Sequence, residues 1–371
     1  MIDRIQRAVR TSSVKGAYDA EVHCFGSFAA GLYLPTADMD LVIVTPTFLR
    51  RGKKIIGQTG TQMRKLAHDL VNAGIAPPGG FVVIPSARVP LVKFADKKTG
   101  IKVDISFENS SGIVANGTFQ RWKELYPAMP VVVVLIKQLL AMRGLNEVFK
   151  GGIGGFTIIC LVVSMLQLMP QAQSGSMNGQ AHYGELLMAF LRLYGSEFNH
   201  TRIGIRFNPP GYFDKQREPP PGQRNQGRLS IIDPNNGNND ISGGSAEIDT
   251  VLDAFKYAYG ELQRRMADVD AGEDVDSILD SIWGGNYTSF AHQRERLSLL
   301  HRGYRVSPVP PPAPVPLNGA ANGPKRKRGK GEQSTLTRKA RKHQPQSDNA
   351  TNGTAPNGRP QHPLPPRPTG R

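Results

Sequence analysis

Three aspartates lie in or beside segments that alternate like β-strands. Asp38 and Asp40 open the segment DMDLVIV, and Asp104 lies inside IKVDISF. Residues two apart in an extended strand point to the same face, so Asp38 and Asp40 should present two carboxylates side by side. Their repulsion is removed if they chelate magnesium, which takes oxygen ligands and keeps substrate phosphates in its remaining positions. The spacing predicts a magnesium and phosphate site that Asp104 would complete from a neighbouring strand.

A Gly-Ser pair precedes these aspartates by about ten residues. Gly26 permits a tight turn, and the local N–H groups and the Ser27 hydroxyl can hold phosphates where the chain enters a helix. Each feature also has a simpler interpretation: a solvated turn at the strand start, an edge-strand charge for Asp104, and a plain loop at Gly26 and Ser27. Their common order along the chain favours one combined site.

The pattern of apolar residues divides the chain into two folded parts. Strand-like segments at 21–28, 40–46, 81–96 and 101–109 alternate with helical ones at 1–15 and 59–74, which predicts an α+β domain with a mixed sheet. Longer apolar helices are expected at 131–145, 156–169, 183–198 and 247–266, with a Pro- and Gly-rich loop at 209–228. We therefore expect a catalytic domain over 1–117, a mainly helical second domain over 118–300 and a disordered, basic, Pro-rich tail over 301–371.

The net charge of +16 is concentrated in the tail. Residues 301–371 hold 14 Lys/Arg against 2 Asp/Glu, while residues 1–300 hold 32 against 28, a net +4. The clusters PKRKRGK and TRKARKH indicate a nuclear localisation signal; phosphate-backbone attraction is a second use, and a solvating tail the simplest alternative.

The cysteines and the N-terminal segment exclude several protein classes. Cys24 and Cys160 are too few for a disulfide framework or a zinc site, and both are expected to be ordinary core residues. No apolar run approaches the roughly 20 residues that a membrane span needs, and the start MIDRIQRAVR is not a secretory signal. These features favour a protein that stays inside the cell.

Four segments together resemble a known enzyme family. GSFAAGLYLPTADMDLVIV, VDISFENSSGIVANG, the stretch from VVVVLIKQLL to LVVSMLQL, and LSIIDPNNGNNDISGGS are similar to the DNA polymerase β-like nucleotidyltransferases, and within them to the nuclear, exosome-associated noncanonical poly(A) polymerases of the TRAMP complex type. The resemblance covers roughly residues 1–300. It implies template-independent transfer of AMP from ATP onto an RNA 3′-hydroxyl, with ATP and magnesium (or manganese) in a cleft between the two domains.

The resemblance also implies roles for the charged residues. Asp38 and Asp40 would bind both metal ions, and Asp104 would join the ion that activates the RNA 3′-hydroxyl. Gly26 and Ser27 would hold the triphosphate. Lys137 would reach the β- and γ-phosphates, although a lysine in an apolar helix can also mark the wet face of that helix.

The remaining implied contacts concern the nucleoside. Asn116 resembles the asparagine that contacts the ribose 2′-hydroxyl, with a helix cap as the alternative. Phe156 would stack on the base, with a core phenylalanine as the alternative; many relatives have Ser-Tyr in place of Gly155-Phe156. The loop IIDPNNGNND resembles the nucleotide recognition motif, shaped by Asp233 and Pro234, with Asn239 or Asp240 near the base. Uridylyl-transferring relatives often carry histidine where this chain has Asn239, which favours ATP.

Two departures from the family affect its expected partners. The chain begins 25 residues before Gly26, whereas family members usually carry additional N-terminal helices. No RNP, KH or zinc-knuckle pattern is visible, so the resemblance implies a zinc-knuckle RNA-binding subunit, an RNA helicase and functional coupling to the nuclear exosome. It implies a nuclear location, with the nucleolus as one candidate compartment. The alternatives are a terminal uridylyltransferase and a catalytically inactive scaffold of an RNA-processing complex.

Overall fold

The computed structural model describes residues 1–307 apart from 88, 223–226 and 286. These residues belong to one compact unit, Met1–Val315. The predicted disordered tail falls almost entirely on 308–371 and therefore lies outside the described residues.

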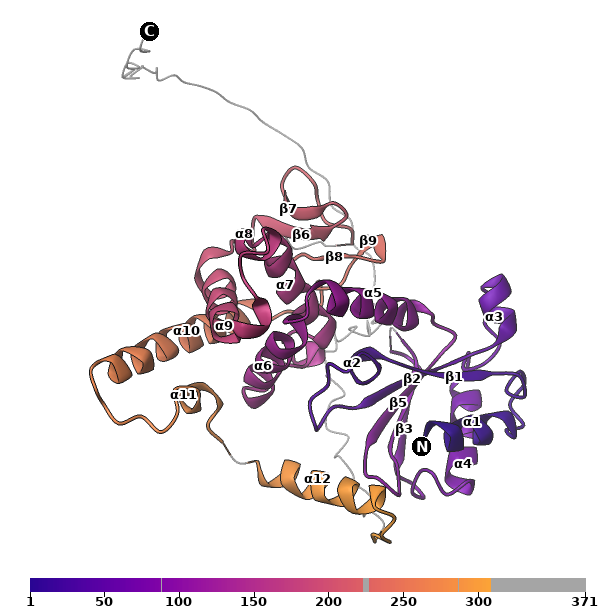
Figure 1. The fold of residues 1–371 in the computed structure, drawn as a ribbon. Helices are drawn as coiled ribbons and strands as arrows, with labels where there is room; N and C mark the ends of the chain where they lie inside the picture. Colours follow the sequence, from indigo (N-terminus) through magenta and orange to yellow (C-terminus); the bar gives the residue numbers. More distant parts are fainter. Residues whose placement is uncertain (88, 223–226, 286, 308–371) are drawn as a thin grey trace, which may run out of the picture. The chain divides into compact units, whose positions relative to one another are not determined.

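The first part of the chain forms a five-stranded sheet with helices (Figure 1). Strands lie in the order β1-β2-β5-β4-β3, and β2 runs parallel to β5 while the other neighbouring pairs are antiparallel. The predicted mixed sheet is confirmed. The elements are α1 (Ile2–Arg10), β1 (Glu21–Phe25), α2 (Gly26–Ala29), β2 (Met39–Val44), α3 (Pro46–Arg51), α4 (Gly60–Asn72), β3 (Phe81–Ile84), β4 (Leu91–Ala95) and β5 (Lys102–Phe107).

Alternation along the strands gives the sheet two different faces. Met39, Leu41 and Ile43 of β2 are buried in a core with Val103 and Ile105 of β5, and that core also takes residues of α1 and α4. The residues between them therefore point to the opposite face. This arrangement commits the even-numbered positions of β2 and β5, including both strand aspartates, to the side away from α1 and α4.

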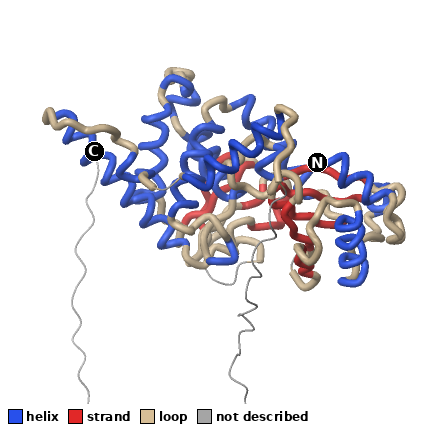
Figure 2. The backbone as a smooth tube through the Cα atoms, turned by 90° about the horizontal axis from the view of Figure 1, so that it is seen from below, coloured by secondary structure: helices blue, strands red, loops and turns tan. Residues whose placement is uncertain are grey.

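The second part is mainly helical, as predicted, with short strands among the helices (Figure 2). Cys160 is fully buried in its core, while Cys24 is half-buried against the core beneath the sheet. The helices are α5 (Ser111–Leu125), α6 (Met129–Met142), α7 (Gly155–Leu168), α8 (Pro170–Gln173), α9 (Tyr183–Arg192), α10 (Ile248–Asp270), α11 (Asp280–Trp283) and α12 (Thr288–His301), with the single turns η1 (Val148–Lys150), η2 (Gly179–Ala181) and η3 (Leu193–Glu197); the strands are β6 (Ile203–Phe207), β7 (Pro210–Asp214), β8 (Ile232–Asp233) and β9 (Asn236–Asp240).

Two local features differ from the sequence pattern. The predicted domain boundary at 117/118 falls inside α5, which already begins at Ser111. The first residues of the predicted 209–228 loop form β7, which pairs with β6 in a two-stranded hairpin. The prediction of a loop there was wrong because proline is tolerated at the first residue of an edge strand, as Pro210 is here. In the described residues, no single helix is long and apolar enough to cross a membrane; α5 and α6 meet that test only as a pair bent by 117°.

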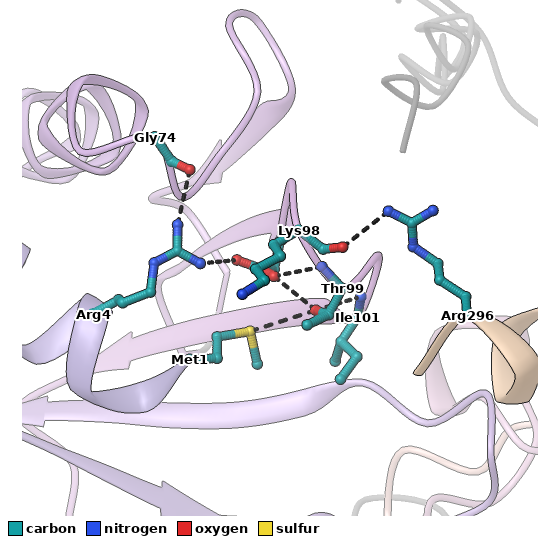
Figure 3. Close-up of polar contacts among 8 residues, drawn as sticks. Met1, Arg4, Gly74, Lys98, Thr99, Ile101 and Arg296 are labelled. Atoms are coloured by element: carbon teal, nitrogen blue, oxygen red, sulfur yellow. Dashed lines mark hydrogen bonds and ion pairs between the residues drawn. The ribbon is translucent and has the colours of Figure 1, made fainter. Parts of the chain in front are cut away.

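The turn between β4 and β5 is held by a buried carboxylate (Figure 3). Asp96 accepts hydrogen bonds from the backbone N–H and hydroxyl of Thr99 at 2.8 and 2.7 Å, and it pairs with Arg4 of α1 at 3.4 Å. Arg4 also donates to the Gly74 carbonyl after α4, and Arg296 of α12 donates to the Lys98 carbonyl at 2.9 Å. These bonds fix the position at which β5 begins, and with it the position of Asp104.

Candidate active site

The strand register places three charged side chains in a row. Asp40 on β2 lies opposite Asp104 on β5, and Asp104 lies opposite Lys93 on β4. All three line a cleft of about 1570 Å³ above the sheet, together with Asp38, which directly precedes β2. The structure therefore brings together the three aspartates that the sequence singled out.

Burial and mutual repulsion disfavour the charged forms of the carboxylates in this row. Burial, followed by repulsion from Asp104 and Asp38, raises the pKa of Asp40 to about 7. Burial also raises the pKa of Asp104, although Lys93 partly opposes this by donating a hydrogen bond of 2.5 Å to Asp104 Oδ2. Partial burial disfavours charged Lys93, but its contact with Asp104 outweighs burial and its pKa is raised.

The raised pKa of Asp40 predicts a pH-dependent stability. The folded protein holds this proton to a higher pH than the unfolded chain does, so folding stability is lost as pH rises towards and through about 7. In metal-free buffer, we expect Asp40→Asn to unfold with a free energy about 1–3 kcal/mol higher than wild type at pH 8. The difference should shrink below pH 7 and vanish near pH 4, as measured by urea denaturation. Equal or lower stability of the variant at pH 8 would contradict the assignment.

The carboxylates fit divalent cations without forming a closed cage for them. Among the described residues, no group of three or more His, Cys, Asp or Glu side chains is arranged as a ready-made metal site. A hard cation of this kind takes one or two carboxylates and completes its shell with water and substrate phosphates, so an open set is what such chemistry needs. The donors here are all oxygens, and the repulsion that raises the pKa of Asp40 is what a divalent cation would relieve.

Gly26 lies directly against Asp40. Its φ is +72°, and a Cβ at this position would lie 2.4 Å from Asp40 Oδ2, closer than real Cβ atoms approach any atom. Gly26 and Ser27 begin α2 and line the cleft beside the aspartates. Only glycine allows the backbone to pass this close to the carboxylate.

Lys137 does not lie on a wet helix face. It is only 9% exposed, lines the cleft and donates a 2.7 Å hydrogen bond to the Leu32 carbonyl. Burial lowers its pKa to about 8, against the opposing effect of Asp40. The snorkelling alternative was wrong because the apolar residues of α6 are buried on several sides. The predicted contact of Lys137 with phosphates stays a prediction.

Of the two residues predicted to contact the base and the ribose, Phe156 lines the cleft and Asn116 does not. Phe156 opens α7, lines the cleft and packs edge-on against Phe119, with ring centroids 5.2 Å apart. Asn116 lies inside α5, so the helix-cap alternative was wrong; it does not line the cleft. Its Oδ1 is buried and makes no hydrogen bond within the described part of the chain. Gly155 leaves space beside Lys137, whose Nζ would lie 3.5 Å from an added Cβ.

The predicted recognition loop is the β8–β9 hairpin. Asp233 accepts hydrogen bonds from the Asn235 backbone N–H and the Asn239 side-chain amide, at 2.9 and 3.0 Å. The Asp240 carboxylate accepts from the hydroxyls of Ser230 and Ser242, at 2.7 and 2.8 Å. Asp233, Asn239 and Asp240 all line the cleft, but the bonds to Asp240 tie its carboxylate to the loop itself.

Two features of the cleft escaped the sequence interpretation. The first is Lys93, which forms an ion pair with Asp104. A signal for it was present in the sequence: the alternation in LVKFA buries Val92 and Phe94 and so places Lys93 on the opposite face of β4. Thr118 of α5 donates a 2.6 Å hydrogen bond to Asn235 and so ties the recognition loop to the helix beside the sheet. No pattern in the sequence predicts this second contact, because it joins residues far apart in the chain.

Comparison with known proteins supplies the family. Residues 1–124 match the central palm domain of the mitochondrial-like poly(A) RNA polymerases, and residues 182–239 match the Cid1 family poly A polymerase model. The polymerase core of TRAMP, an RNA surveillance complex, superposes with a TM-score of 0.64 at 31% identity, covering 76% of this chain and 84% of that one. The chain belongs to the noncanonical poly(A) RNA polymerase family.

Curated members of this family extend beyond the matched region. Poly(A) RNA polymerase cid14 of Schizosaccharomyces pombe is 35% identical over 84% of this chain and 44% of its own length. Poly(A) RNA polymerase protein 1 of Saccharomyces cerevisiae is 34% identical over 76% of this chain and 42% of its own length. This chain thus spans less than half the length of either relative. Another family member, Trf4-2 of Drosophila melanogaster, is 31% identical over 71% of this chain and is described as inactive.

Proposed function

We propose that this protein transfers AMP from ATP onto RNA 3′ ends without a template and releases pyrophosphate. The observation that carries this proposal is the pairing of Asp40 with Asp104 across β2 and β5, on the face of the sheet that lines the cleft. An inactive relative in the family makes the alternative of a scaffold concrete. The three aspartates in one cleft favour an enzyme over that alternative.

The proposed reaction assigns work to the residues around the row of charges. Asp38, Asp40 and Asp104 would hold magnesium or manganese, which when bound lowers the pKa of an attacking hydroxyl and neutralises the leaving pyrophosphate. Gly26 and Ser27 would hold the triphosphate beside these carboxylates, and buried Lys137 would supply a positive charge close to Asp40. Lys93 would balance the charge of Asp104 on the side of the cleft where the RNA end is proposed to lie.

Base choice is proposed to depend on the β8–β9 hairpin. Asn239 lines the cleft, and its side-chain amide is oriented by its bond to Asp233. An asparagine amide offers both a donor and an acceptor, which suits the edge of adenine. We propose stacking of the base on Phe156, which lines the cleft. We also propose contact of Asn116 with the ribose, because Asn116 Oδ1 makes no hydrogen bond within the residues described; since Asn116 does not line the cleft, this contact requires its side chain to shift when the nucleotide binds.

The test is extension of 5′-labelled oligo(A) RNA by the full chain, with each of the four NTPs supplied separately in magnesium. We expect ATP to be used at least about tenfold more efficiently than UTP, a difference of about 1.4 kcal/mol in transition-state binding. Preferred use of UTP would make the protein a terminal uridylyltransferase. Absence of extension with every NTP, in magnesium and in manganese, would favour the inactive scaffold.

We further propose that the enzyme acts on nuclear RNA as part of a larger assembly. A solved relative is the polymerase core of an RNA surveillance complex, and the Lys/Arg clusters at 325–330 and 338–342 suit a nuclear address. A zinc-knuckle RNA-binding subunit and an RNA helicase are the proposed partners, with the exosome acting on the tailed RNA. Purification of the tagged chain from nuclei should recover such subunits; recovery only outside the nucleus and without them would contradict this proposal.

A further inference from the structure

The segment between β2 and the middle of α4 has an unusual charge. Residues 41–68 contain six Lys/Arg and no Asp or Glu, a net +6, whereas residues 1–300 as a whole carry +4. The rest of that region therefore has a net charge of −2. The net positive charge of residues 1–300 is thus no larger than that of this one short segment.

Four of these cations form what we call the basic ridge: Arg50, Arg51, Lys53 and Lys54. All four are exposed, at the end of α3 and in the turn that follows it. Figure 1 shows α3 projecting from the end of the sheet at which β2 finishes. Gly52 turns the chain between the two pairs with a φ of +65°, and nothing lies within 4 Å of the position of its absent Cβ. The ridge is therefore open to a large partner.

The ridge is held in place by the start of α4. The Gln58 side-chain amide donates to the Lys54 carbonyl at 2.6 Å, and the Gln62 side-chain amide donates to the Ile55 carbonyl at 3.4 Å. Ile56 is 1% exposed and packs into the core beneath the sheet. Arg64 and Lys65, both exposed on α4, lie within the first turns of the same helix. Bonds of this kind position the cations before any partner arrives.

The charge of the ridge is largely uncompensated. None of its four side chains forms an ion pair with Asp or Glu of the described chain. Lys54 does interact electrostatically with the buried Glu108. Arg50 and Arg51 in the last turn of α3 complement the helix dipole, which is the simplest reason for their presence. That reason does not extend to Lys53 and Lys54, which lie beyond the helix.

We propose that the basic ridge binds the phosphate backbone of the acceptor RNA upstream of its 3′ end. The inference rests on the proposed function, since it assumes that the RNA end lies at Asp40 and Asp104. From Asp40 to Val44 the chain rises about 13 Å, and α3 adds up to about 9 Å. At about 3.4 Å per stacked nucleotide, the ridge then meets RNA about six nucleotides from the end. Such contacts involve phosphates and read no bases.

The test compares two variants that each lose two exposed cations from the full chain. Lys53→Gln with Lys54→Gln removes half of the ridge, while Arg217→Gln with Lys256→Gln removes two exposed cations of the helical part. Binding of fluorescent A20 and A5 RNA is measured by anisotropy at several salt concentrations. For the ridge variant, we expect A20 affinity to fall five- to tenfold and the salt slope of log K to fall by about 1.4, the value for two contacts with a single strand. The affinity of the ridge variant for A5, and the affinity of the control variant for A20, should each change less than twofold.

The outcomes separate this inference from the proposed function. If wild type extends RNA but the ridge variant binds A20 with unchanged affinity and salt slope, the ridge inference is overturned and an acidic protein becomes the better partner. If wild type neither binds nor extends RNA, both proposals fail together. Equal losses in the ridge and control variants would also overturn the inference, because they would show a general effect of net charge. The single variants Lys53→Gln and Lys54→Gln repeat the test with a smaller change to the fold. Each is expected to lower A20 affinity two- to fourfold.

Discussion

Asp38→Ala combined with Asp40→Ala is expected to abolish RNA extension while the protein remains folded. Both side chains line the cleft, and Asp40 lies opposite Asp104 in the parallel strand pair. Without these oxygens, divalent cations lose most of their protein ligands, and the charge that develops on the pyrophosphate is no longer balanced. We expect the extension rate to fall at least about 1,000-fold, which corresponds to about 4 kcal/mol of lost transition-state stabilisation. Gel-based extension of oligo(A) RNA measures this rate.

A matched control separates the loss of the site from a loss of charge. Asp253→Ala with Asp270→Ala removes two exposed carboxylates of α10 and should extend RNA at the wild-type rate. Circular dichroism should show thermal unfolding of the Asp38 and Asp40 variant at or above the wild-type temperature, since burial and repulsion at Asp40 are relieved. If the variant that lacks Asp38 and Asp40 extended RNA near the wild-type rate, the assigned site would be refuted.

Gly26→Ala is the second change for which we expect a large effect. The added methyl group would lie 2.4 Å from Asp40 Oδ2, and the positive φ of +72° also disfavours any residue with a Cβ. Either α2 or the Asp40 carboxylate must shift, so we expect extension to fall at least about 100-fold, or about 2.7 kcal/mol. Steady-state kinetics with ATP should show the loss mainly in kcat, because the displaced group is a catalytic one.

The control for Gly26→Ala is an alanine substitution at a glycine that has a similar positive φ but no atom close to the added methyl group. Gly74 has a φ of +67°, and no atom lies within 4 Å of its ideal Cβ position. Gly74→Ala should therefore lose about 1 kcal/mol of folding stability and keep its extension rate. If both alanine variants lose activity to the same degree, backbone strain rather than contact with Asp40 explains the result.

The main architecture could be predicted because its residues follow strong local patterns. Asp40 and Asp104 occur in the short, β-branched apolar segments DLVIV and IKVDISF, and this is why the sequence placed both of them on strands. The long apolar runs that became α6, α7, α9 and α10 were likewise predicted as helices. Residue type and hydrophobic period were enough to predict the secondary structure of these segments, because each is stabilised by burying one face or its whole circumference in the core.

Other features depend on contacts that no local pattern contains. The pairing of Lys93 with Asp104 follows from the register of β4 on β5, which the turn around Asp96 sets. Asn235 and Asp240 occur in a run of polar residues that is typical of any turn, yet one bonds Thr118 and the other is 9% exposed. The start of α5 was missed because Gly112 and Gly117 weaken its helical signal.

Binding of manganese tests the central claim most directly, because it does not depend on RNA or on turnover. Titration of the full chain with Mn²⁺ in the presence of a non-hydrolysable ATP analogue, followed by electron paramagnetic resonance, counts the bound ions. We expect nucleotide-dependent Mn²⁺ binding in wild type and at least about tenfold weaker binding in a variant with Asp40→Asn and Asp104→Asn, a difference of about 1.4 kcal/mol. Equal Mn²⁺ binding by the two proteins would show that these carboxylates do not hold the metal.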